Sequence, residues 1–176
     1  MQLKAVILGA GKGTRMLPLT KTKPKALLPS KENSLLLNQI KFLRTYTSEI
    51  IVTVGYMKNE MLKALKSYGI ENYIIGENLD NAFWINHSFF NNYNGPLIVI
   101  TCDNVLDINI NKLIEEYYEN NEKSILVGVK GSSENADKVI FSKNNIEEIS
   151  KNISSKFFLS GLQVLNISEL QEAEEQ

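Results

Sequence analysis

The sequence alternates short apolar runs with amphipathic segments, and this alternation restricts the fold more than any other feature. Apolar runs typical of buried strands occupy residues 3–8, 49–56, 72–76, 95–104 and 124–129. Patterns that favour helices lie between or after them, over residues 34–46, 59–69, 81–93 and 110–121. This order predicts right-handed βαβ units and a parallel sheet covered on both faces.

The alternation of strand and helix patterns ends after residue 137. Residues 138–150 are typical of a β-hairpin that turns at Asn144-Asn145, and residues 156–166 predict a further strand. The acidic end, residues 167–176, is expected to have no apolar face of its own. We therefore predict an α/β protein: a Rossmann-like three-layer sandwich with a mostly parallel mixed sheet and a small β-hairpin appendage. Without repeats or a long linker, residues 1–176 are expected to form a single domain.

Charge and cysteine content exclude several classes of function. The 19 Lys and Arg residues nearly balance the 20 Asp and Glu residues, so neither nucleic acid nor a membrane surface is an expected partner. No apolar run approaches the roughly 20 residues that cross a bilayer, and no signal peptide is recognised. One cysteine and one histidine exclude a disulfide framework and a multi-histidine zinc site. A cytoplasmic location is the expectation.

The segment "LGAGKGTRMLPLTKTKPKALLP" (residues 8–29) follows the first predicted strand and is rich in glycine, proline and basic residues. In open α/β sheets, ligands bind beyond the carboxyl ends of the strands, where glycines let backbone N–H groups approach them closely. Arg15 and the lysines that follow supply the charge that a polyphosphate needs. The usual P-loop pattern is absent, and Thr14 breaks the dinucleotide-binding fingerprint.

The whole segment resembles the signature of nucleotidyltransferases that make nucleoside-diphosphate sugars and related activated alcohols. The signature reads G-x-G-T-R-[ML]-x-P-L-T, a short spacer, then P-K-x-L-[LV]-P. The matching positions are Gly11, Gly13, Thr14, Arg15, Pro18, Leu19, Thr20, Pro24, Lys25, Leu28 and Pro29. The resemblance continues more weakly to about Asn166.

The resemblance implies attack by a phosphate monoester on the α-phosphorus of a nucleoside triphosphate, with release of pyrophosphate. Such catalysis is mostly positioning and charge neutralisation. By resemblance, Arg15 holds the triphosphate and the leaving pyrophosphate, and Lys25 bridges the α-phosphate and the attacking phosphate. The residues expected to bind the nucleotide are Leu8, Gly9, Ala10, Gly11, Lys12, Gly13, Thr14, Arg15, Asn78 and Ser88.

The motif "ITCDN" predicts a metal site, because Asp103 ends an apolar strand. This strand end lies at the same sheet edge as residues 9–13, called the glycine loop below. Mg²⁺ favours one or two carboxylates together with phosphate oxygens and water. Family members usually have Gly at the position of Cys102, which we interpret as a packed residue and not a nucleophile. A later aspartate usually completes this metal site. Asp137 has no family motif around it, so either the metal site is incomplete or the chain is truncated at its C-terminus, and we favour the hypothesis of truncation.

The acceptor is expected to be a small phosphorylated alcohol and the nucleotide CTP. Ser150-Lys151 stands where hexose-phosphate enzymes carry Glu-Lys, and the Asn-rich aromatic segment 78–93 is similar to that of cytidylyltransferases activating phosphocholine. Lys25, Trp84 and Lys151 are the expected acceptor-binding residues, although an aromatic face also suits the core. The resemblance implies a role in the decoration of surface polysaccharides, because family members usually act there. The sequence does not decide whether the protein forms a homo-oligomer. Two alternatives remain: a hexose-1-phosphate thymidylyl- or uridylyltransferase, and a catalytically silent nucleotide-binding regulator.

Overall fold

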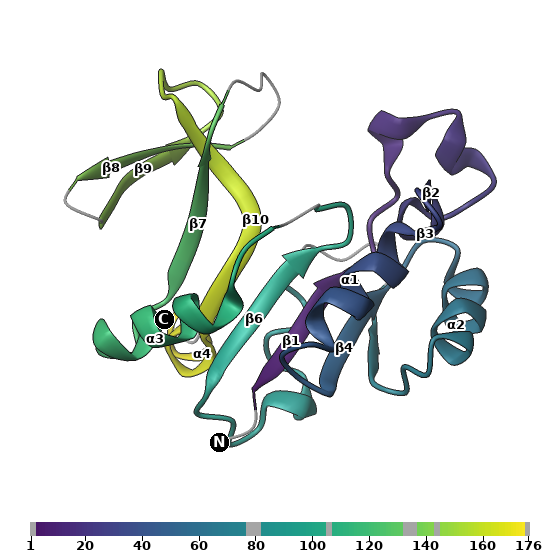
Figure 1. Ribbon diagram of the computed structural model, residues 1–176, viewed down its shortest axis with the longest axis horizontal. Coiled ribbons are helices and arrows are strands. Elements are labelled where there is room, and N and C mark those ends of the chain that lie inside the picture. Colours follow the sequence, from purple (N-terminus) through teal and green to yellow (C-terminus); the bar gives the residue numbers. More distant parts are fainter. Residues whose placement is uncertain (1–2, 77–81, 105–106, 132–136, 143–144, 175–176) are drawn as a thin grey trace.

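The computed structural model describes residues 3–76, 82–104, 107–131, 137–142 and 145–174 (Figure 1). In this part of the chain an eight-stranded sheet has the order β5-β4-β1-β6-β10-β8-β9, with β7 paired to β10. Its strands are β1 Lys4–Leu8, β4 Glu49–Val54, β5 Tyr73–Ile75, β6 Pro96–Thr101, β7 Ile125–Lys130, β8 Lys138–Ser142, β9 Asn145–Ser150 and β10 Phe157–Asn166. The α-helices are α1 Leu35–Leu43, α2 Lys58–Ser67, α3 Ile110–Glu119 and α4 Ile167–Glu174. A two-stranded ribbon pairs β2 Pro29–Ser30 with β3 Asn33–Ser34.

The parallel half of the sheet is centred on β1, which pairs in parallel with both β4 and β6. Ala5 lies opposite Ile50 on one side and Ile98 on the other. β10 is antiparallel to β6 and to β7, so β7 runs in the same direction as β6. The mixed, mostly parallel sheet and the α/β class are therefore confirmed.

Helix α1 shows why the sequence pattern succeeds locally. Ser34 begins it as the N-cap: its hydroxyl oxygen accepts a hydrogen bond from the Leu37 N–H at 3.1 Å. Leu36, Ile40 and Leu43 recur at helical spacing, and all three are fully buried. A buried aliphatic side chain contributes about 1.5–3 kcal/mol, so this face fixes α1 on the sheet.

Alternating residues of β1 face two separate cores. Ala5 and Ile7 pack in the cluster that contains the apolar residues of α1, α2 and α3. Val6 points to the opposite face, into the cluster formed with residues 82–93 and α4. Helical layers thus cover both faces of the sheet, as the three-layer prediction requires.

The helix predicted over residues 81–93 is wrong for the residues that the structure describes. Residues 82–87 form turns, followed by a 3₁₀-helix at Ser88–Phe90. Here the His87 ring nitrogen Nδ1 accepts from the Phe89 N–H at 3.3 Å and so competes with a regular helix. Trp84 and Phe90 pack edge to face within the core, with their ring centroids 5.6 Å apart. Packing onto the sheet decides this segment, not helical propensity.

The C-terminal segment also differs from expectation. Residues 167–174 form α4, and Ile167 and Leu170 pack against the second core, so the tail does have an apolar face. The hairpin of β8 and β9 is confirmed, while residue 144 of its predicted turn lies outside the described residues. Among the described helices, none combines the length and apolar character of a membrane span.

Candidate active site

A cavity of about 640 Å³ lies where β1, β4 and β6 end, as expected for an open α/β sheet. This volume falls in the usual range for small-molecule sites. Its walls come from the loop after β1, from the turn after β6 and from the middle of β10. The lining residues are Leu8, Ala10, Gly11, Gly13, Thr14, Arg15, Met16, Lys25, Thr53, Phe83, Thr101, Cys102, Asp103, Asn104, Asp137, Leu159, Ser160 and Gly161.

The glycine loop is held closely against β4. The Gly9 N–H donates to the Thr53 hydroxyl at 3.0 Å, and the Tyr56 N–H donates to the Ala10 carbonyl at 3.0 Å. Gly55 permits this approach, because a Cβ there would lie 2.7 Å from the Ala10 carbonyl oxygen. The loop backbone therefore has a fixed path at the edge of the cavity.

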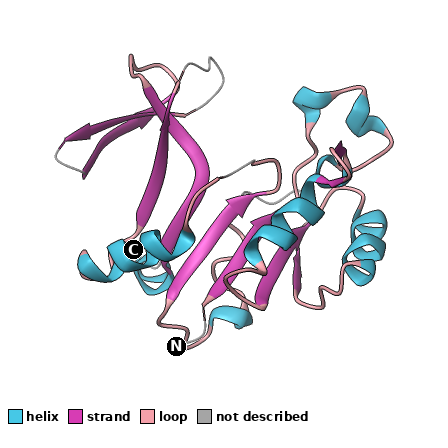
Figure 2. Ribbon diagram, in the orientation of Figure 1, coloured by secondary structure: helices cyan, strands magenta, loops and turns pink. Residues whose placement is uncertain are grey.

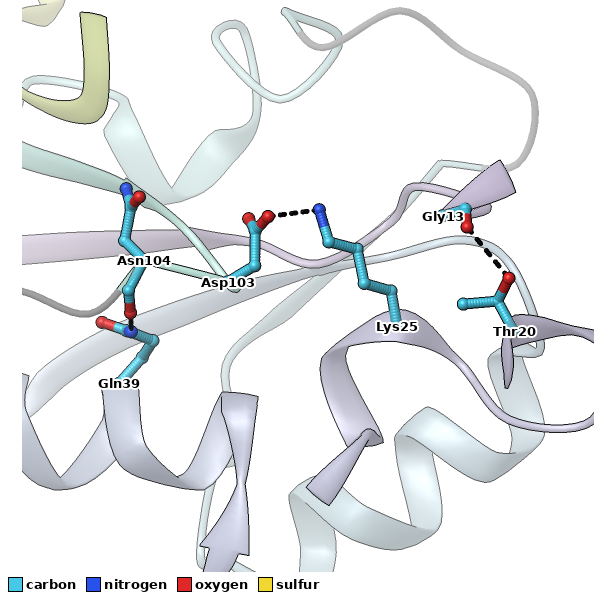
Figure 3. A network of polar contacts seen from close by, with 6 residues as sticks. All are labelled: Gly13, Thr20, Lys25, Gln39, Asp103 and Asn104. Atoms are coloured by element: carbon cyan, nitrogen blue, oxygen red, sulfur yellow. Dashed lines mark hydrogen bonds and ion pairs between the residues drawn. The ribbon is translucent and has the colours of Figure 1, made fainter. Parts of the chain in front are cut away.

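Three short 3₁₀-helices, Thr14–Met16, Leu19–Lys21 and Lys25–Leu27, carry the chain from the glycine loop to Lys25. Figure 2 shows this segment as loop interrupted by short helical turns. The buried Thr20 hydroxyl donates to the Gly13 carbonyl at 2.9 Å (Figure 3). The Tyr56 hydroxyl donates to the Thr20 carbonyl at 3.0 Å.

Gly13 has a left-handed φ of 63°, and a Cβ at this position would lie only 2.8 Å from Lys25 Cβ. A glycine is therefore needed on both conformational and steric grounds. The result is that the Lys25 side chain passes directly beside the glycine loop and points into the cavity.

Lys25 and Asp103 form an ion pair of 2.5 Å between Nζ and Oδ2 (Figure 3). Partial burial of Asp103 opposes its ionisation, but the hydrogen bond and charge of Lys25 outweigh this, helped by the Thr101 hydroxyl. The pKa of Asp103 is lowered below its usual value as a result. The cavity thus presents an ionised carboxylate beside a fixed ammonium group.

Cys102 lines the cavity but is 5% exposed. Burial, followed by the neighbouring charge of Asp103, raises the pKa of its thiol to about 11. A neutral thiol is a poor nucleophile, which agrees with the interpretation of Cys102 as a packing residue.

Most of the residues predicted from the opening motif meet at this cavity. Arg15, Lys25 and Asp103 line it together, and so do five of the predicted loop residues: Leu8, Ala10, Gly11, Gly13 and Thr14. Gly9 is buried beneath the loop and Lys12 is exposed, and neither lines the cavity. Phe83 does line it, and its ring lies against Gly76, where a Cβ would clash.

Three other predicted residues that the structure describes, Ser88, Trp84 and Lys151, are not among the residues that line the cavity. Ser88 belongs to the segment at the opposite sheet edge, where Lys4 Nζ at the start of β1 donates to the Phe89 carbonyl at 2.6 Å. Trp84 is 3% exposed in the core and does not reach the cavity, because the turns at 82–87 direct it onto the sheet. Lys151 follows β9, is exposed, and lies outside the cavity lining. Asn78 falls outside the described residues.

The cavity lining also contains Asp137, Asn104 and Gly161, which were not among the predicted site residues. Asp137 precedes β8, and its carbonyl accepts from the Leu159 N–H at 2.8 Å, which attaches it to β10. Gly161 lies at an irregularity in β10, where the pairing register with β7 shifts. A glycine inside a strand pattern is the one signal that would have indicated a close backbone approach here.

Asp103 and Asp137 both line the cavity, and so do Thr53 and Thr101. Among the described residues, no group of three or more His, Cys, Asp or Glu side chains could hold a metal ion. Mg²⁺ needs fewer protein ligands, because substrate phosphates and water complete its octahedron. The hard oxygen donors present therefore fit Mg²⁺ bound together with a phosphate ligand.

Comparison with known proteins agrees with this geometry. Residues 4–138 match the family described as Nucleotidyl transferase. A choline-phosphate cytidylyltransferase from Streptococcus pneumoniae is 34% identical over 110 residues, covering 59% of this chain and 46% of that protein. A mannose-1-phosphate guanyltransferase from Aspergillus oryzae is 26% identical over 189 residues, covering 96% of this chain and 52% of that protein. The chain thus spans about half the length of these curated relatives.

The fold is shared with a Bacillus anthracis protein assigned as a glucose-1-phosphate thymidylyltransferase. Its solved structure superposes with a TM-score of 0.82 at 20% identity, covering 98% of this chain and 75% of that one. The family match extends over more than half of the sequence and includes the glycine loop, Lys25 and Asp103. The chain therefore belongs to the nucleotidyl transferase family.

Proposed function

We propose that this protein transfers a nucleotidyl group from a nucleoside triphosphate to the phosphate of a small phosphorylated alcohol, releasing pyrophosphate. The observation that carries the proposal is the shared cavity in which Lys25 and Asp103 meet at 2.5 Å beside the Arg15 loop. Cationic groups, a carboxylate and backbone N–H groups at one sheet edge are what phosphoryl-group chemistry requires.

In this proposal, Arg15 holds the triphosphate and the departing pyrophosphate. Lys25 contacts both the α-phosphate and the attacking phosphate, which lowers the repulsion between two anions. The attacking phosphate is already anionic, so the chain need not supply a general base. Asp103, with Asp137 close to the same space, would hold Mg²⁺. When bound, the ion would neutralise the charge that develops on the phosphate oxygens.

We assign CTP as the preferred nucleotide, supported by the 34% identity to a choline-phosphate cytidylyltransferase. The compact acceptor is supported by the apolar surface that Phe83 and Leu159 contribute to the cavity wall. A hexose hydroxyl buried against these two apolar side chains without a hydrogen-bond partner would cost about 1–3 kcal/mol. A CDP-linked alcohol of this kind suits a transferase that decorates surface polysaccharide.

A hexose-1-phosphate nucleotidyltransferase is the second candidate, favoured by the mannose-1-phosphate guanyltransferase relative that aligns with nearly the whole chain. The deciding experiment is a matrix of CTP, UTP, dTTP and GTP against phosphocholine, other phosphorylated alcohols and hexose 1-phosphates, read by pyrophosphate release. We expect the highest kcat/KM for CTP with a phosphorylated alcohol. A maximum with any hexose 1-phosphate would replace this assignment with the second candidate.

A silent nucleotide-binding regulator would give a different result. It would bind CTP in a calorimeter and release no pyrophosphate with any acceptor. The Arg15→Ala variant is the control in both assays, because the fold and the rest of the cavity lining should survive the loss of this exposed side chain. Turnover in the wild type that disappears in Arg15→Ala supports the enzyme.

A further inference from the structure

Gln39 is a polar side chain on the core-facing side of α1. It is 4% exposed and lies next to the fully buried Leu36 and Ile40. Burial of an amide among aliphatic side chains costs free energy unless a hydrogen bond compensates for it. The position therefore needs an explanation beyond packing.

The partner of Gln39 is the active-site turn. Its Nε2 atom donates to the backbone carbonyl of Asn104, which is 65 positions away in the sequence (Figure 3). The Asn104 N–H in turn donates to the Thr101 carbonyl at 3.3 Å and closes the turn that carries Asp103. Gln39 thus connects the buried face of α1 to the residue that directly follows the candidate metal ligand.

The same turn is held on its other sides by close contacts. The Cys102 N–H donates to the Leu8 carbonyl at 3.2 Å, which attaches the start of the turn to β1. A Cβ on Gly161 would lie 2.9 Å from both Asn104 Nδ2 and Thr101 Oγ1. Strand β10 therefore packs against the turn too closely for a side chain at this position. Asn104 Nδ2 itself is shielded from solvent and has no hydrogen-bond partner.

We infer that Gln39 is a positioning residue for the reaction. It fixes the Asn104 carbonyl from below and thereby keeps the Asp103 carboxylate directed at Lys25 and into the cavity. The catalytic consequence rests on the proposed function, whereas the structural consequence for the turn does not. Removal of a residue that orients a metal ligand commonly lowers activity about 10–100-fold.

The test compares Gln39→Met with Thr47→Val. Methionine keeps the length and volume of the side chain but cannot donate. Thr47 is the matched control: it is 8% exposed and also donates to a backbone carbonyl, that of Leu3, at the opposite edge of the sheet. Both variants lose a partly buried hydrogen bond to a backbone carbonyl, and Thr47→Val also removes the acceptor of the Glu49 N–H, but only Gln39 is connected to the turn.

The first readout is amide hydrogen exchange, which needs no substrate. We expect the amides of Cys102 and Asn104 to exchange about tenfold faster in Gln39→Met and at the wild-type rate in Thr47→Val. The second readout is steady-state kinetics. Gln39→Met should lower kcat about 10–100-fold and change the KM for the triphosphate less than about twofold, since the glycine loop is intact.

Unchanged exchange at the turn together with unchanged kcat would overturn the inference, and so would equal effects in Thr47→Val. Gln39→Asn, which keeps the amide but is too short to reach Asn104, provides a second variant. If neither Gln39 variant folds, Gln39 is a core residue and the inference is also wrong. If the wild type shows no turnover with any acceptor, the proposed function fails, and the exchange data alone still decide the role of Gln39.

Discussion

Replacing Lys25 with alanine tests the central feature of the site. The ammonium group lies 2.5 Å from the Asp103 carboxylate on the wall of the cavity, and the two side chains are 20% and 38% exposed. The substitution removes one cation from the place where two phosphates are proposed to meet. It leaves the glycine loop and the backbone of the 3₁₀-helix at Lys25–Leu27 in place.

The structure gives different magnitudes for stability and for catalysis. Both members of the ion pair are partly exposed to water, so its loss should lower the free energy of unfolding by about 1 kcal/mol or less. In a chain of 176 residues this corresponds to a fall in Tm of about 2–4 °C. Loss of a preorganised charge that stabilises the transition state costs much more, about 3–4 kcal/mol, or 10²–10³-fold in kcat.

The sign of the pH dependence follows from Asp103. Lys25 holds the pKa of Asp103 below its usual value, against the opposing effect of burial. The pair therefore stabilises the fold above the unfolded-state pKa of about 4, and this contribution is lost as the pH falls through the folded-state value. The difference in unfolding free energy between the wild type and Lys25→Ala should be present at pH 7 and shrink below about pH 4.

The assay combines pyrophosphate release at saturating substrates with thermal unfolding at several pH values. Lys23→Ala is the matched control, because Lys23 is an exposed lysine on the same segment that does not line the cavity. The reasoning is refuted if Lys25→Ala retains the kcat of Lys23→Ala. It is also refuted if Lys25→Ala unfolds at neutral pH, since Lys25 would then act mainly in stability.

Three further predictions concern the same cavity. Asp103→Asn should abolish turnover, and a Mg²⁺ titration of nucleotide binding should show a weaker response than in the wild type; identical titrations would exclude Asp103 as the metal ligand. Cys102 should resist labelling by a thiol reagent at pH 8 until denaturant is added, because its thiol is buried and has a pKa of about 11; rapid labelling of the folded protein would contradict this. Gly161→Ala should lower the free energy of unfolding by at least about 1–2 kcal/mol in urea, since Gly161 has a φ of 79° and an added Cβ would lie 2.9 Å from Thr101 Oγ1; unchanged stability would show that the turn can move to accommodate the Cβ.

Local patterns in the sequence were sufficient for the regular elements. Ser34 and the spacing of Leu36, Ile40 and Leu43 specify α1 because capping and burial act within one helix. The parallel strands were predictable for a similar reason, since continuous apolar runs suit strands buried on both faces. Residues 82–93 were not predictable in this way. The conformation of this segment depends on how its aromatic side chains pack against one face of the sheet, and that packing is visible only in the tertiary structure.

The residues of the candidate site likewise fall into two groups: those that local motifs predicted and those that only the tertiary structure brings to the cavity. Arg15 and Lys25 lie in the motif after β1 and Asp103 lies just after β6, so the positions of the strand ends together with the family resemblance predicted that they would meet. Asp137 reaches the cavity only because β8 and β10 pair beside β6, and Gln39 only because α1 crosses under the turn. A glutamine within an otherwise apolar helix face was nevertheless a visible signal that a buried hydrogen bond had to be satisfied.

The ion pair at the centre of the site also explains how the two proposed ligands would depend on one another. With Lys25 and Asp103 paired, a phosphate must compete with the carboxylate for the ammonium group, and a cation must compete with the ammonium group for the carboxylate. Each ligand alone breaks the pair and leaves one partly buried charge without its partner, which is costly. Nucleotide and Mg²⁺ together supply a partner for both charges. Metal and triphosphate binding would therefore be positively coupled through the pair, and by reciprocity the coupling would act equally in both directions.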